Sequence, residues 1–211
     1  MTISISAFGR GFRLSNCLAI AFGAATLFAL FVVVVTLRAQ AEVSTYLRDP
    51  AVIFEFSPFV GLISYVGILA TFSAGMICLF ASAHTRDDAA LLRAIGLFGL
   101  LLATDDLLML HEEVFPNLLG FPERLVFIVY FLIAIGIAIF HRVALFRQPT
   151  AGLMLAIALL GSSVVVDILF EYSSKEVIVE DGLKFVGLAV WSAYWINRAS
   201  SAVVAATRPP A

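Results

Sequence analysis

The chain has 211 residues, of which 62% are hydrophobic and only 13% are charged. Soluble domains carry about 25% charged residues, so this composition excludes an ordinary soluble domain. Cys17 and Cys78 both lie in apolar segments, apart from any Cys/His cluster, which argues against a disulfide framework or a cysteine-based zinc site. No phosphate-binding loop, nucleotide fingerprint or nucleic-acid-binding motif occurs, so no nucleic-acid partner is predicted.

Six apolar segments approach the length of about 20 residues that a helix needs to cross a bilayer core. They cover residues 16–37, 58–83, 91–110, 124–146, 151–170 and 181–197. The third and fifth contain acidic residues and the sixth is short, so these three depend partly on their context. The pattern predicts an all-α, polytopic membrane protein in which residues 1–211 form one bundle of six transmembrane helices. In the second segment Gly67, Thr71 and Gly75 are spaced by four residues, which predicts close packing against another helix.

The first segment also resembles a cleavable signal peptide in outline, because a small-x-small pattern follows it at residues 39–41. Its apolar stretch, residues 17–37, is longer than the roughly 7–15 residues of a signal peptide's hydrophobic core. We therefore retain this segment as the first transmembrane helix.

The distribution of lysine and arginine predicts the orientation, because cytoplasmic loops carry an excess of both residues. If the N-terminus is cytoplasmic, eight basic residues lie on the cytoplasmic side and five on the other. The eight are Arg10, Arg13, Arg86, Arg93, Arg142, Arg147, Arg198 and Arg208, and the five are Arg38, Arg48, Arg124, Lys175 and Lys184. We therefore predict a protein of the cell inner membrane, surrounded by membrane lipids, with both termini in the cytoplasm.

In this topology 13 of the 15 acidic residues lie toward the extracytoplasmic side. Asp105 and Asp106 are about 14 residues into the third span, or roughly 21 Å along it. A carboxylate at such a depth indicates a functional site. On a continuous helix, the seven-residue spacing would align Asp105 with Glu112 and Asp106 with Glu113, and would bring His111 to the same helix end.

Two further spans bring ionisable residues to the same membrane face. Asp167 and Glu171 are four residues apart near the outer end of the fifth span. Lys184 lies about one turn into the sixth span, where it could meet an acid from a neighbouring helix. Because odd-numbered spans run outward and even-numbered spans run inward, we expect one pocket formed by Asp105, Asp106, His111, Glu112, Asp167, Glu171 and Lys184.

Carboxylates combined with an imidazole suit hard or borderline divalent cations. The predicted metal ligands are His111, Glu112, Asp167 and Glu171, and the identity of the ion stays open. The predicted catalytic residues are Asp105, Asp106 and Lys184. The pattern matches neither HExxH nor the Glu-x-x-His motif of di-iron bundles. Two alternatives remain, a metal-free network of ion pairs that includes Lys184 and a pair of carboxylates that handles protons.

The segment from Asp105 to Glu113, DDLLMLHEE, and the segment from Glu180 to Trp191, EDGLKFVGLAVW, resemble motifs in a family of uncharacterised bacterial multi-pass membrane proteins. The resemblance implies that the two motifs act together. The placement of the intramembrane Asp and His is also distantly similar to the ceramidase and adiponectin-receptor superfamily of membrane hydrolases. That superfamily uses a zinc site with a His-x-x-x-His pair on a late helix, whereas the last span here contains no histidine.

These features favour a metal-dependent hydrolase of a lipid-like substrate, in which the ion activates water and a carboxylate acts as base. One alternative is a transporter of cations or protons, and another is a non-catalytic membrane sensor or assembly protein. A transport route needs polar groups through the middle of the membrane. Residues 91–103 contain only Arg93 as a charged residue, and residues 151–161 contain none. The predicted site is therefore one-sided, which favours an enzyme or a sensor over a transporter.

Overall fold

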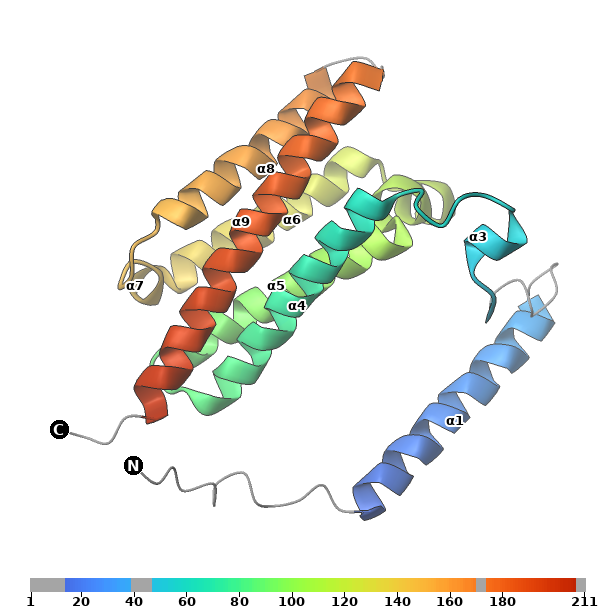
Figure 1. Cartoon of the computed structure of the whole chain (residues 1–211), viewed down its shortest axis with the longest axis horizontal. Coiled ribbons are helices and arrows are strands. Elements are labelled where there is room, and N and C mark those ends of the chain that lie inside the picture. The colour runs from blue at the N-terminus through green and yellow to red at the C-terminus, as the bar shows by residue number, and fades with distance from the viewer. Residues whose placement is uncertain (1–13, 39–46, 170–173, 208–211) are drawn as a thin grey trace. The chain divides into compact units, whose positions relative to one another are not determined.

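The computed structural model describes residues 14–38, 47–169 and 174–207, and Figure 1 shows its helices. The chain divides into two compact units, Met1–Val60 and Gly61–Ala211. Within the described ranges every element is a helix, which confirms the predicted all-α class.

The first unit contains α1, Leu14–Arg38, and the single-turn helix α3, Pro50–Ile53. The helix α1 covers the first predicted span. The short helix α3 begins at a proline, whose missing N–H costs nothing in the first turn. Its N-cap is Asp49, whose carboxylate accepts a hydrogen bond from the Ala51 N–H at 2.8 Å. This turn therefore forms from purely local signals.

The second unit holds the other five predicted spans as long helices. They are α4, Leu62–His84; α5, Ala89–Leu108; α6, Glu123–Phe140; α8, Ala151–Leu169; and α9, Ser174–Thr207. A π-helix, η2, Leu110–Leu119, follows α5, and the one-turn helix α7, Arg142–Leu145, follows α6. The helix α4 packs along α5 and α9, and α8 packs along α9 (Figure 1).

Two helices, Leu62–His84 and Glu123–Phe140, are long and apolar enough to cross a membrane by length and composition. The apolar part of α8, Ala151–Asp167, is shorter than either of these helices. The helix α9, at 34 residues, is twice as long as the span predicted within it. The six-span arrangement therefore stays a prediction. The two qualifying helices differ in burial, because a third of the apolar window in α4 is buried and almost none of that in α6 is.

Glycines allow α4 and α5 to approach each other closely, as the small-residue spacing in the second span predicts. Gly67, Thr71 and Gly75 are all buried on α4. A Cβ atom at Gly96 of α5 would lie 2.8 Å from the carbonyl oxygen of Gly75 and 2.7 Å from Cγ of Leu79. Because the Gly75 oxygen belongs to the backbone, it cannot rotate away, so this crossing requires glycine at position 96.

Gly96→Ala should therefore destabilise the protein by about 1–3 kcal/mol, the usual cost of overpacking. The measurement is the thermal unfolding midpoint of detergent-solubilised protein. Gly136→Ala is the matched control, because nothing lies within 4 Å of the Cβ position there and alanine favours a helix over glycine. Equal unfolding midpoints for the two variants would contradict the close approach of α4 and α5.

Arg198 ties together the ends of the helices that lie farthest from the acidic motif. Its side chain is fully buried, and its guanidinium donates to the carbonyl oxygens of Ala144 and Leu145, the latter at 3.0 Å. It also lies 3.4 Å from the carboxylate of buried Asp88, which precedes α5. In the sequence analysis Arg198 serves only as one of the basic residues that predict the orientation. In the fold its side chain joins α9 to the start of α5 and to α7.

Candidate metal centre

The acidic motif lies where α5 ends and the π-helix η2 begins. The helix α5 stops at Leu108, and Met109 adopts the left-handed conformation with φ 49° and ψ 44°. Its N–H donates to the carbonyl oxygen of Asp105. Because this residue breaks the helix, the predicted alignment of Asp105 with Glu112 and of Asp106 with Glu113 is wrong. Left-handed backbone is uncommon for a residue with a long side chain and is often found at functional sites.

The carboxylate of Asp105 binds a single residue, His111, through both of its oxygens. Its Oδ1 accepts the His111 backbone N–H at 3.0 Å, and its Oδ2 lies 2.5 Å from Nδ1 of the imidazole. An ionised carboxylate only accepts hydrogen bonds, so Nδ1 carries the hydrogen and donates it. Asp105 is 3% exposed and His111 is 5% exposed. The contact therefore fixes the orientation of the imidazole ring inside the protein.

The second ring nitrogen of His111, Nε2, points toward the more exposed Glu112. Nε2 lies 3.4 Å from Oε1 of Glu112, whose side chain is 48% exposed. Burial lowers the pKa of His111, but its contacts with Asp105 and Glu112 outweigh burial and raise the pKa to about 10. The contact between His111 and Glu112 lowers the pKa of Glu112. Without a bound cation, the imidazole is therefore protonated between two carboxylates.

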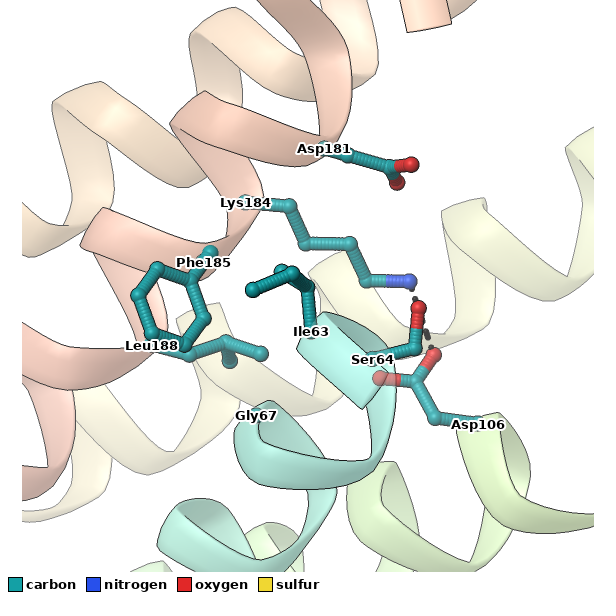
Figure 2. A pocket seen from close by; sticks show the side chains of 8 residues that line it. All are labelled: Ile63, Ser64, Gly67, Asp106, Asp181, Lys184, Phe185 and Leu188. Atoms are coloured by element: carbon teal, nitrogen blue, oxygen red, sulfur yellow. Dashed lines mark hydrogen bonds and ion pairs between the residues drawn. The ribbon is translucent and has the colours of Figure 1, made fainter. Parts of the chain in front are cut away.

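Asp106 is paired with Lys184, the cation predicted to meet an acid from a neighbouring helix, and this meeting is confirmed. Lys184 Nζ donates to Oδ1 of Asp106 at 3.0 Å, which joins α9 to α5 (Figure 2). Both side chains line a hollow of about 20 Å³, together with Ser64 and Asp181. A hollow of this size accommodates about one water molecule.

Three of the predicted site residues form a group that could hold a metal ion. Asp105, Asp106 and His111 each offer one ligand atom, and these atoms lie within 4.8 Å of one another. The donor set of carboxylates and imidazole suits a divalent cation of borderline hardness. The fold thus joins two acids from the end of α5 to a histidine from η2.

Of the other predicted ligands, Glu112 and Asp167 are not members of this group. Asp167 on α8 is exposed, and its charge, after the effect of burial, contributes to raising the pKa of Glu180. Glu171 falls outside the described residues. Glu113, which was predicted to align with Asp106, instead accepts a hydrogen bond from Asn117 of η2 at 2.6 Å.

Two aromatic residues from α6 complete the surroundings of the site and were not predicted. The ring of Phe127 packs against His111, with 5.1 Å between centroids. The buried hydroxyl of Tyr130 faces Asp105 but is not aligned for a hydrogen bond with any described residue. In the sequence both residues belong to an uninterrupted apolar span, and only the single hydroxyl distinguishes Tyr130 from membrane-facing aromatics.

Lys184→Met should lower the free energy of unfolding by about 1 kcal/mol, the upper end for partly exposed pairs. A fully buried pair would cost about 3–5 kcal/mol, but 37% of the Lys184 side chain is exposed. The double variant Lys184→Met/Asp106→Asn should recover part of the loss, because it no longer leaves an unpaired carboxylate. Thermal unfolding in detergent measures both effects.

Arg124→Met is the control for this prediction. Arg124 is an exposed cation at the start of α6 with no ion pair among the described residues. Its loss should leave the unfolding midpoint unchanged. The pairing account fails if the Lys184 and Arg124 variants unfold at the same temperature.

Comparison with known proteins gives one match, to a family model. Neither a curated protein nor a solved structure matches the chain. Thus no match supports the resemblance to the ceramidase and adiponectin-receptor hydrolases. The family model matches residues 19–197 and carries the description "Domain of unknown function (DUF8692)". Its range includes the whole acidic motif and Lys184, and it agrees with the resemblance to an uncharacterised family. The chain therefore belongs to the family of the domain of unknown function DUF8692.

Proposed function

We propose that this chain is a multi-pass protein of the bacterial inner membrane that binds a divalent metal ion near the extracytoplasmic face. The support for the membrane location begins with α6, an apolar helix that is almost unburied within its unit. In a soluble protein, a wholly apolar helix is normally buried in the core. Large side chains such as Phe131, Leu132 and Phe140 are instead exposed, as side chains in contact with lipid would be.

The proposed spans are the six apolar segments predicted from the sequence. The helices α4 and α6 support two of them directly by length and composition. The helices α1, α5, α8 and α9 contain most of each of the other four, and η2 would lie at the outer face. Each predicted span thus has a helix that contains most of it.

The predicted topology can be tested with reporter fusions. Fusions after Arg86 and Arg147 should be active on the cytoplasmic side, and a fusion after Asn117 on the extracytoplasmic side. The reason is the excess of lysine and arginine in the segments assigned to the cytoplasm. The reverse pattern would place the acidic motif in the cytoplasm and contradict the proposed orientation.

The observation that carries the metal proposal is that Asp105, Asp106 and His111 bring carboxylate oxygens and an imidazole nitrogen within 4.8 Å of one another, with Oε1 of Glu112 3.4 Å from Nε2 of His111. Asp105 and His111 are buried, so packing within the fold fixes the positions of their side chains. An alternative role for the same residues is a structural network of ion pairs. In that case, loss of one member would lower stability, and no ion would be bound.

The second part of the proposal is that the site hydrolyses a lipid-like substrate. A bound divalent ion would supply a water molecule of lowered pKa at neutral pH. Asp106 lines the hollow that fits about one water and has a carboxylate oxygen held by Lys184 at 3.0 Å. Asp106 would act as the base for a water in this hollow, with the Lys184 ammonium beside its carboxylate.

Metal analysis of purified protein tests the proposed binding. After incubation with Zn²⁺ or Mn²⁺ and removal of the excess, the wild-type protein should retain about one ion per chain. His111→Ala should lose the ion, and because it leaves the buried Asp105 carboxylate without its partner, it should also unfold at a lower temperature. His84→Ala is the matched control, because exposed His84 lies at the far end of α4, and it should retain the ion.

Two results would count against metal binding at this site. One is a wild-type protein without a bound ion after loading, which would favour the structural network. The other is a His111→Ala protein that keeps its ion, which would locate the binding site elsewhere.

A further inference from the structure

We propose that the ion is held by Nε2 of His111 together with the carboxylate of Glu112, and that Asp105 is a positioning residue for His111 rather than a ligand. This inference rests on the metal binding proposed above and specifies its coordination. The ligand pair, one imidazole nitrogen and one carboxylate oxygen, suits a divalent ion of borderline hardness such as Zn²⁺.

The first argument is the distance between Asp105 and the imidazole. Two atoms that bind one ion at about 2.0–2.2 Å are separated by roughly 3 Å or more. Nδ1 of His111 and Oδ2 of Asp105 are only 2.5 Å apart, which is the distance of a strong hydrogen bond and not of two ligands. The other oxygen of Asp105 accepts the His111 backbone N–H at 3.0 Å. Both oxygens of Asp105 are therefore engaged by His111.

The second argument is the distance on the opposite side of the ring. Two ligands at about 2.1 Å from a tetrahedral zinc ion are separated by about 3.4 Å. Nε2 of His111 and Oε1 of Glu112 are 3.4 Å apart. This contact is longer than a good hydrogen bond and has the spacing of two ligands. The pair can therefore bind an ion with little movement of either side chain.

The third argument is the chemical relation between the two nitrogens of the His111 ring, Nδ1 facing Asp105 and Nε2 facing Glu112. A histidine that binds a metal through one nitrogen commonly donates its other N–H to a carboxylate, which fixes the ring and makes the free nitrogen more basic. Asp105 stands in that relation to His111. Asp106 is engaged by Lys184 at 3.0 Å, so we do not count Asp106 among the ligands. The remaining positions on the ion would be open to water or substrate.

Cobalt substitution distinguishes a ligand from a positioning residue, because the visible absorption of Co²⁺ reports its coordination. The experiment titrates Co²⁺ into the wild-type protein, Asp105→Asn, Glu112→Gln and the matched control Glu113→Gln. Glu113 is a glutamate adjacent to Glu112 whose carboxylate is held by Asn117. Asp105→Asn should weaken binding about 10- to 100-fold with an unchanged absorption spectrum. Glu112→Gln should change the spectrum, and Glu113→Gln should change neither property.

Several outcomes would overturn the proposal, and they separate it from the failure of metal binding as such. If wild-type protein binds Co²⁺ but Asp105→Asn alters the spectrum while Glu112→Gln does not, metal binding stands and the coordination proposed here is wrong. If wild-type protein binds no Co²⁺, both proposals fail. If Asp105→Asn does not fold, Glu112→Gln decides alone, because the Glu112 side chain is half-exposed and an unchanged spectrum would overturn the inference.

Discussion

The contact between Asp105 and His111 is the constraint on which the rest of the site depends. A carboxylate at the end of an apolar helix is unfavourable unless its charge is compensated by close donors. Asp105 obtains two of them from one residue six positions later. At Met109 the backbone adopts a left-handed conformation and a π-helix replaces the α-helix, and in this arrangement His111 reaches Asp105. A backbone of this kind costs on the order of 1–3 kcal/mol, which the two charge-assisted hydrogen bonds offset.

Charged side chains join α5 to α9 at both ends of the second unit. At one end Lys184 binds Asp106 across the two helices, and at the other Arg198 lies against Asp88. Between these ends the described core is formed by apolar residues such as Cys78, Phe98 and Trp191. Segregation of charge to the helix ends is expected for helices that cross an apolar medium. Within the described residues, apolar packing therefore separates the two ion pairs.

The sequence was sufficient to predict the helices and the meeting of Lys184 with an acid, but not the geometry of the acidic motif. Apolar length and proline positions determine the helices, and these are local properties. The break after Leu108 has no such signal, because no glycine or proline occurs between Asp105 and Glu113. At the break, Asp105 is buried and both of its oxygens contact His111, and the sequence pattern does not reveal that contact. Arg198 shows the same limit, because a basic residue near a helix end is indistinguishable in sequence from a charge in the membrane interface.

The two carboxylates that face His111 differ in exposure, and this difference separates their proposed roles. Asp105 is buried, so removing it from His111 would leave an unpaired charge within the protein, which is strongly unfavourable. Glu112 is half-exposed, so water can solvate its carboxylate whenever it leaves His111. An ion that takes the place of the proton on Nε2 therefore disturbs only the solvated partner. The buried contact keeps the ring in place whether or not an ion is bound, and for this reason the arrangement suits a site that gains and loses a metal without unfolding.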